Sequence, residues 1–226
     1  IRKNVMALST YTELKSSIAN FLNRSDLTTE IQDDFIKLVE ADMNAKLRIR
    51  QMEQNDDVTI NAETVTVPTG FIAVRSFHIL SGDTKYHLEY ITPGNLFEIK
   101  GGSTSGMPRT YTVESDNGTE SFRFAPSPDT SYTGKLQYYK AFTALSDSNT
   151  SNYILANHPA IYLYGSLYHA SNFIGGIDPN QTQQWLGMYS AALERCENND
   201  RQDSYGSAPV VQRTDVSTDL SFYRRK

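Results

Sequence analysis

Apolar residues recur at helical spacing near both ends of the chain and alternate with polar residues in between. The first periodic stretch follows a capping box at Thr10–Glu13, and its apolar face consists of Tyr11, Leu14, Ile18 and Leu22. After a polar break at 23–26, a second capping pattern at Thr29–Gln32 begins a helix that we expect to continue to about Gln51. One side of that helix carries Ile31, Phe35, Leu38, Asp42 and Leu47. The pattern predicts two helices before the first strand.

The second predicted helix is polar at a point where a simple helical bundle would be apolar. Asp42 lies on the side that carries the apolar residues, and Lys46 follows it four positions later, which is one helical turn. We therefore predict that Asp42 and Lys46 belong to a surface that meets solvent or a neighbouring subunit.

From about Asp56 to Ser148, short β-branched and aromatic runs replace the helical period. Most runs alternate, and clusters of Gly, Pro, Asn, Asp or Ser separate them, which predicts about six strands. Asp116-Asn117-Gly118 is a hairpin signal between two of them. The one helical piece expected here is a short turn at Asn95–Ile99. The region is predicted to form a compact antiparallel β-domain.

Two further helices are predicted after the strands. The first begins at His158-Pro159, with proline in its first turn, and ends at Gly175-Gly176. The second begins at Asp178-Pro179 and ends in the polar run 197–200. It carries the clearest apolar stripe of the chain: Trp185, Met188, Tyr189, Ala192, Leu193 and Cys196.

Three tyrosines of the third long helix lie on more than one of its faces. They are Tyr162, Tyr164 and Tyr168. A helix with aromatic residues on several faces has several neighbours, and tyrosine is favoured where a large ring is buried beside a wet edge. We predict a subunit interface at these residues; a thick core between the helices and the β-domain is the alternative.

Helices at both ends with strands between them predict an α+β protein. We expect the N- and C-terminal helix pairs to form a four-helix bundle, with the antiparallel β-domain inserted between them and an extended C-terminal tail. The expected segments are 6–55 and 151–203 for the helix pairs, 56–150 for the β-domain and 204–226 for the tail. Met6 is the expected natural start.

The tail is rich in Ser, Gly, Thr, Asp and Pro and has no helical period. Fixing each residue's backbone costs about 1–2 kcal/mol, so we expect the tail to be mobile in the free protein and to order only against a partner. The residues predicted to bind that partner are Val210, Val211, Phe222, Tyr223, Arg224 and Arg225.

Composition and charge narrow the choice of partners. The net charge is −5 and the pI is about 5.4, so the chain as a whole does not attract nucleic acid. The 38 % hydrophobic content fits an elongated subunit with much surface per residue. No segment approaches the ~18 apolar residues that a membrane span needs, so no membrane contact is predicted.

No residue pattern indicates a metal or a nucleophile. His158 and His169 would lie about 16 Å apart along one helix, too far to share a metal ion. His78 and His87 are expected to pack across a hairpin. The single cysteine, Cys196, lies on an apolar stripe and is expected to be buried.

Catalytic and phosphate-binding motifs are likewise missing from the sequence. Gly101–Gly106 resembles a phosphate loop in composition but lacks the Lys-Ser/Thr that follows such a loop. The pairs Asp33-Asp34, Asp56-Asp57 and Glu40 with Asp42 lie at helix ends or solvent-facing positions, where acidic residues are common. We therefore predict no enzymatic activity and no cofactor.

Several segments, taken in order, resemble a known family. They are Tyr11–Lys15, Ile18–Leu27, Phe35–Ala41, Leu47–Glu53, Pro68–Phe71, Pro126–Asp129, Leu136–Tyr139 and His158–Leu167. They resemble the head-to-tail adaptor, or connector, proteins of tailed bacteriophages. The likeness runs from about Tyr11 to Asp203.

The resemblance implies a structural subunit that forms a ring, expected to be a dodecamer, beneath the portal protein. The ring would extend the DNA channel, and DNA would pass through its lumen during ejection without specific binding. The β-domain would face the tail nozzle or other tail proteins, and the C-terminal tail would reach onto the portal. The subunit would assemble in the host cytoplasm and reside in the neck of the virion.

Two other functions stay open at this point. A carbohydrate-binding tail or surface module would show exposed Trp and Tyr platforms. A hydrolase would need a convergent polar pocket.

Overall fold

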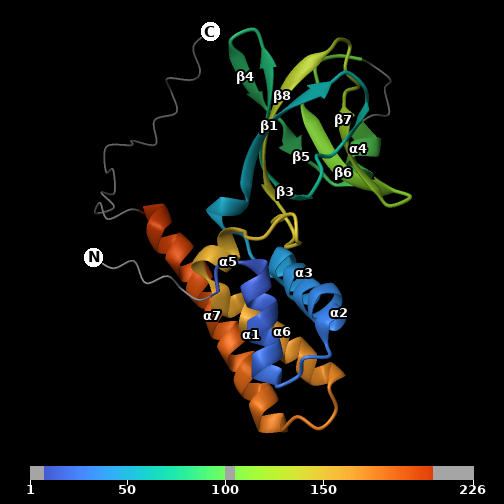
Figure 1. Cartoon of the computed structure of the whole chain (residues 1–226). Coiled ribbons are helices and arrows are strands. Elements are labelled where there is room, and N and C mark those ends of the chain that lie inside the picture. The colour runs from blue at the N-terminus through green and yellow to red at the C-terminus, as the bar shows by residue number, and fades with distance from the viewer. Residues whose placement is uncertain (1–7, 100–104, 206–226) are drawn as a thin grey trace.

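The computed structural model describes residues 8–99 and 105–205 (Figure 1). Its helical elements are α1 (Tyr11–Leu22), α2 (Thr28–Glu30), the π-helical turn η1 (Ile31–Phe35), α3 (Ile36–Lys46), the 3-10 turn η2 (Arg50–Met52), α4 (Pro93–Ile99), α5 (Tyr153–Asn157), α6 (Pro159–Phe173) and α7 (Pro179–Tyr205). Its strands are β1 (Glu53–Ile60), β2 (Thr64–Thr66), β3 (Phe71–Ser81), β4 (Thr84–His87), β5 (Glu89–Tyr90), β6 (Thr110–Asp116), β7 (Thr119–Ala125) and β8 (Tyr132–Lys140).

The strands form two four-stranded sheets that share an aromatic core. Sheet A has the order β1-β8-β3-β4, and sheet B has the order β2-β7-β6-β5. The pairings are antiparallel except that β5 runs parallel to β6. Phe77 of sheet A lies with its ring centroid 5.2 Å from that of Phe122 in sheet B. Tilted and edge-to-face rings of this kind bury large apolar area between the sheets.

The predicted hairpin at Asp116-Asn117-Gly118 is confirmed. Asn117 and Gly118 join β6 to β7 with φ angles of 48° and 80°. Two consecutive residues with positive φ define the turn that matches the twist of a two-residue hairpin, which is why Asn-Gly occurs there. The predicted helical turn near Asn95–Ile99 is also present, as α4.

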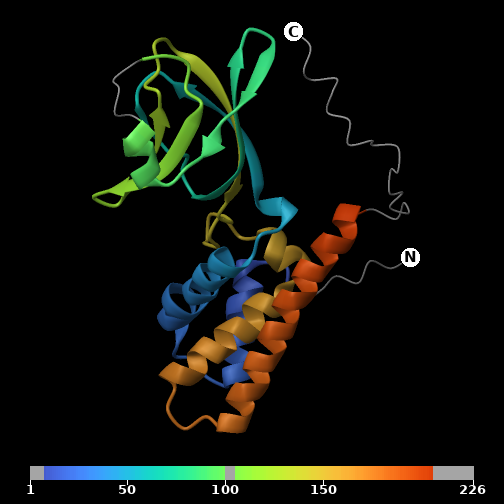
Figure 2. The ribbon, with the colours of Figure 1, turned by 180° about the vertical axis from the view of Figure 1, so that it is seen from behind.

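The helices pack around α6, in which most residues from 161 to 170 are buried. It contacts α1, α3 and α7, and its buried residues are Ile161, Tyr162, Leu163, Gly165, Ser166, Leu167 and Ala170. A Cβ on Gly165 would lie 2.8 Å from Val39 Cγ2 and 3.0 Å from Tyr189 Cε2. Glycine at 165 therefore allows α3 and α7 to approach α6 at the same point. Figure 2 shows α6 between α3 and α7.

The predicted architecture, a four-helix bundle carrying an inserted antiparallel β-domain, is wrong. The structure is α+β, with a β-rich core of two four-stranded sheets and with the other long helices arranged about α6. A bundle helix presents one apolar stripe, whereas α6 presents apolar residues all round and so takes a central place. The parallel β5–β6 pair also departs from the expected antiparallel pattern. The segment limits at 55, 150 and 203 stay predictions.

The π-helical turn η1 changes which face of the following helix is buried. Ile36, Val39 and Met43 are buried, while Leu38 is 48 % exposed. One extra residue in a helical turn rotates the rest of the helix by about 100° relative to an unbroken α-helix. The helical spacing of the sequence therefore placed Leu38 on the inner side, and the structure places it outside.

The predicted helix ends agree with the structure except in three places, and the first is the end expected near Gln51, because α3 ends at Lys46. The Thr10–Glu13 capping box is present, His158 precedes Pro159 at the start of α6, and the Asp178 carboxylate accepts the Asn180 N–H at 2.9 Å. The second predicted capping pattern is wrong, because the residue before α2 is Leu27, which makes no side-chain cap.

Helix α7 also continues past its predicted end at 197–200, to Tyr205. Arg201 pairs with Glu197 at 3.6 Å one turn away, and Arg50 pairs with Asp200 and Asp203 at 3.1 and 3.5 Å. These ion pairs hold the polar last turns of α7 against the residues that lead into β1. No helix in the described part of the chain is both long and apolar enough to cross a membrane.

Candidate functional site

Two large apolar side chains are exposed to solvent beside a groove between α3 and α6. Leu38 is 48 % exposed and Phe173 is 59 % exposed. The groove has a volume of about 510 Å³, and its lining residues are Asp33, Asp34, Phe35, Lys37, Leu38, His169, Asn172 and Phe173. We call it the α3–α6 groove. Exposed apolar side chains gathered at one groove are typical of a contact surface between proteins.

The floor of the α3–α6 groove is apolar and one rim is acidic. Phe35 is buried beneath Phe173, and the two rings meet edge to face with centroids 5.7 Å apart. On the rim, Asp33 accepts a hydrogen bond from Lys37 at 2.8 Å, and Asp34 lies beside it. The groove therefore suits an apolar side chain flanked by positive charge.

Asp42 and Lys46 extend this surface toward α7. The Asp42 carboxylate lies 3.5 Å from Lys46 Nζ and 3.6 Å from His169 Nε2. Burial lowers the pKa of His169 below its usual value, and Asp42 acts in the opposite direction. The two residues are at the surface, with side chains 37 % and 56 % exposed. Their place in a subunit interface stays a prediction.

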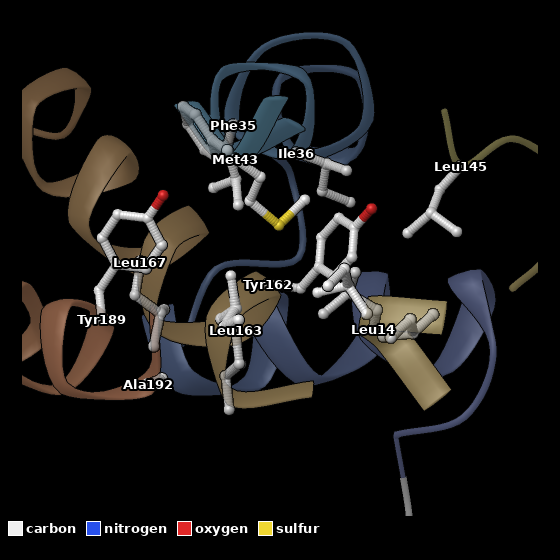
Figure 3. Close-up of a cluster of buried hydrophobic side chains, with 14 of the residues drawn as sticks. Leu14, Phe35, Ile36, Met43, Leu145, Tyr162, Leu163, Leu167, Tyr189 and Ala192 are labelled. Atoms are coloured by element: carbon white, nitrogen blue, oxygen red, sulfur yellow. The ribbon is translucent and has the colours of Figure 1, made fainter. Parts of the chain in front are cut away.

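The three predicted interface tyrosines have different surroundings. Tyr162 is completely buried, and Figure 3 shows its ring among Ile36, Met43 and Leu14. Tyr162 therefore belongs to the core of the subunit, and its predicted role in an interface does not fit this burial. Tyr164 and Tyr168 are half-buried against the helical core, and their predicted interface role stays open to test.

Glu40 is a buried carboxylate, so the expectation that it lies, with Asp42, at a helix end or a solvent-facing position is wrong. Its Oε1 accepts the Leu145 N–H at 2.7 Å and the Tyr162 hydroxyl at 3.1 Å, and that hydroxyl accepts a hydrogen bond from Asn152 Nδ2 at 2.6 Å. Burial raises the pKa of the Glu40 carboxyl, while the hydrogen bonds from Leu145 and Tyr162 act to lower it. One turn along α3, Asn44 Oδ1 accepts the Phe142 N–H at 3.1 Å.

These contacts attach the segment that follows β8 to helix α3. Phe142 and Leu145 follow β8 directly, so α3 holds this segment at two backbone amides. The signal in the sequence is a glutamate between Val39 and Met43, both of which are buried. A charged residue inside a buried stripe indicates an internal partner.

His78 and His87 are paired across the β3–β4 hairpin, as predicted. Their ring centroids are 5.0 Å apart. Burial lowers the pKa of His78, and the nearby His87 and Lys85 lower it further. His78 therefore favours the neutral state at pH 7.

The lowered pKa gives a prediction for acid stability. Because the folded pKa of His78 lies below its unfolded value near 6.5, the folded state binds fewer protons and stability is lost as the pH falls below about 6.5. His78→Thr should reduce this loss by less than about 1 kcal/mol between pH 7 and pH 5. Urea unfolding at pH 7 and pH 5 measures the loss of stability in each protein. Tyr86→Thr on the same hairpin is the control. An equal pH dependence in His78→Thr and the wild type would contradict the argument.

The other candidate chemical groups make internal contacts. Cys196 is buried, and burial raises the pKa of its thiol to about 11. Asp56 accepts the Tyr138 hydroxyl at 2.8 Å, and Asp57 pairs with Lys135 at 2.6 Å. In residues 8–99 and 105–205, no group of three or more His, Cys, Asp or Glu side chains could hold a metal ion.

The predicted binding residues of the tail lie outside the described residues. They are Val210, Val211, Phe222, Tyr223, Arg224 and Arg225. Met6 and most of the segment Gly101–Gly106 lie outside them as well.

Comparison with known families gives one match over most of the chain. A family model described as SU10 adaptor protein matches residues 9–213. That range includes every element from α1 to α7. No curated protein matched the chain.

Proposed function

The chain belongs to the SU10 adaptor protein family, whose members are phage adaptors, and from this premise we propose that it is a structural subunit and not an enzyme. In this proposal, copies of the chain form a ring below the portal protein of a tailed bacteriophage. The ring extends the DNA channel and offers a docking surface to tail proteins. The subunit assembles in the host cytoplasm and becomes part of the virion neck, and it needs no cofactor.

The observation that carries the proposal is the α3–α6 groove with Leu38 and Phe173 at its edges. A closed ring needs two different surfaces on each copy, one for each neighbour. We assign the groove, with Asp42 and Lys46, to the contact with one neighbour. The half-buried Tyr164 and Tyr168 are candidates for the contact with the other.

The negative net charge of the chain supports the proposal that DNA passes through the ring without being bound. With a net charge of −5, the ring would make few Lys or Arg contacts to phosphate. Each such contact would strengthen binding and slow the movement of the DNA.

Exposed aromatic residues in the β-rich part support docking of tail proteins there. Tyr86, Tyr90 and Phe97 are 43 %, 55 % and 55 % exposed. The single tryptophan, Trp185, is buried on α7 and cannot form a sugar-stacking platform. This burial removes the residue that would best support carbohydrate binding.

A double substitution in the groove tests the ring contact. Leu38→Asp with Phe173→Asp should weaken ring formation on portals by at least tenfold, because two apolar anchors are lost and charge is added beside Asp33 and Asp34. Native mass measurement of the protein, alone and mixed with portal, gives the copy number. Phe21→Asp is the matched control, since Phe21 is 54 % exposed on α1 and outside the groove.

Two results would count against this proposal. If the double variant joins portals in the same copy number as the wild type, the groove is not a subunit contact. If the wild-type chain binds portals as single copies, the ring itself is wrong.

A further inference from the structure

One half of β3 has a free edge. Among the described residues, β3 pairs with β8 along one side, but on its other side β4 pairs only with His78–Ser81. The Leu88 N–H then donates to the Phe77 carbonyl at 2.9 Å, and the chain crosses to sheet B, where Glu89 pairs with Thr110. The edge from Phe71 to Ser76 therefore has no neighbouring strand on that side in the described part of the chain.

A groove of about 500 Å³ runs along this free edge. It touches every residue from Phe71 to Phe77. Because consecutive residues of a strand point to opposite faces, a groove that touches all of them follows the backbone edge and not one face of the sheet. Its other wall includes apolar residues that lie near or in sheet B: Leu88, Tyr90, Tyr111 and Val113.

Such an edge can accept an added strand. Unpaired N–H and C=O groups along the edge are a template for an extended peptide, which gains main-chain hydrogen bonds. Every second side chain of that peptide would point to the Tyr111 and Val113 wall, and the side chains between them would point to solvent. The groove therefore fits a segment in which apolar and polar residues alternate.

The chain itself contains such a segment after α7. Between Thr214 and Tyr223, the residues at even positions are apolar or β-branched and those at odd positions are polar up to Ser221. The first set is Val216, Thr218, Leu220 and Phe222, and the second set is Asp215, Ser217, Asp219 and Ser221.

The end of α7 lies within reach of the free edge. Asp200 accepts hydrogen bonds from the Arg50 N–H and Nε at 3.2 and 3.1 Å, and Arg50 is three residues before the first residue of β1. The first residue of β1 pairs with Tyr139, which pairs with Ala73 of β3. This path is about 25 Å long from Asp200 and at most about 33 Å from Tyr205, where α7 ends, whereas the chain from Tyr205 to Val216 spans about 36 Å when extended. Figure 1 shows the end of α7 beside the turn that leads into β1.

We propose that Val216–Phe222 of the free subunit adds to the open edge of β3 in the same chain as an extra strand. Val216, Leu220 and Phe222 then face the apolar wall of the groove. An attached segment has a high effective concentration at a site it can reach, which favours the same chain over another copy. The two register shifts of β3, at 71/73 and 74/76, limit the added ladder to about four or five residues.

This inference goes beyond the proposed function and concerns the isolated chain. It stands whether or not the tail contacts the portal. The expectation of a mobile tail in the free subunit falls on residues outside the described ones, and this proposal is the alternative to it. Where both contacts form, the portal has to displace this strand from β3.

Hydrogen exchange of the full-length chain tests the proposal. Leu220→Ser with Phe222→Ser removes the apolar face of the segment, and Asp219→Asn with Ser221→Asn is the matched control on its polar face. Peptides covering 71–76 should exchange roughly tenfold more slowly in the wild type and the control than in the Leu220/Phe222 variant. Thermal unfolding of the three proteins is the control for folding.

Two outcomes would overturn the proposal. The first is equal exchange of 71–76 in all three proteins, which would mean that the segment does not cover β3. The second is protection that increases with protein concentration, which would mean that another copy supplies the strand.

Discussion

Glu40→Leu will lower the free energy of unfolding by about 3 kcal/mol, whereas Glu40→Gln will change it by less than about 1 kcal/mol at pH 7. Leucine leaves the Leu145 N–H and the Tyr162 hydroxyl without their acceptor in a site where residue 40 is only 7 % exposed. A buried donor without a partner costs about 1–3 kcal/mol. Glutamine retains an Oε1 that can accept both bonds and removes a charge from the interior.

The same pair of variants has a defined pH dependence. Burial holds the folded pKa of Glu40 above its unfolded value near 4.5. The stabilising contribution of the protonated carboxyl is therefore complete below pH 4.5 and is lost as the pH rises through the folded pKa. Relative to Glu40→Gln, the wild type should become less stable between pH 4.5 and pH 8.

Urea unfolding at pH 4.5 and pH 8 measures both effects, and Tyr162→Phe separates the two acceptor bonds. Glu30→Gln is the matched control, because Glu30 lies at the end of α2 and is not buried. A Glu40→Leu variant as stable as the wild type would show that the network contributes nothing. Equal pH dependence in the wild type and Glu40→Gln would show that the Glu40 pKa is not raised.

A chain that ends after Asp203 will fold but will attach to portals at least one hundredfold more weakly than the full chain. This prediction rests on the proposed function. Among the residues that the structure describes, the last buried core residue is Cys196, so the deletion removes none of the described core side chains. It removes all six predicted binding residues of the tail, from Val210 to Arg225.

Sedimentation of the full and the shortened chain with purified portal measures the difference in their affinity for the portal. Thermal unfolding of the two chains is the control for folding. The substitutions Arg224→Gln and Arg225→Gln in the full chain isolate the basic end from the apolar anchors. If the shortened chain attaches as tightly as the full chain, the tail has no role in docking.

Local features of the fold could be predicted from the sequence because short-range geometry decides them. The Thr10 cap, the Asn117-Gly118 hairpin and the proline in the first turn of α6 each depend on a few neighbouring residues. The family could be predicted for a different reason, since it depends on the order of many short segments between Tyr11 and Asp203. The family match at residues 9–213 confirms that resemblance.

The arrangement of the helices could not be predicted, because it depends on contacts between distant residues. Apolar residues on every side of α6 indicate several neighbours, but only the contacts of Gly165 with Val39 and Tyr189 show which helices they are. Tyr162 was placed at a surface for the same reason. Its partner Glu40 is far away in the sequence, and no local pattern joins the two.

The candidate surface was predicted in part. Asp42 and Lys46 lie at the surface beside the α3–α6 groove, but the groove's apolar residues were missed. Leu38 was counted with the core because its spacing from Phe35 is helical. Phe173 was not considered because it is the last residue of α6, next to the Gly175-Gly176 stop.

The π-helical turn Ile31–Phe35 makes the chemistry of this surface depend on a residue count. Closing this turn into an ordinary α-helical turn without removing a residue would rotate everything after it in α3 by about a quarter of a revolution, and Leu38 and Asp42 would then point inward. If one residue of the turn were deleted as well, Val39 and Met43 would keep facing α6. In an alignment of relatives, a single gap at this turn would therefore mark a subunit that has lost the wide turn but shows its neighbours the same face.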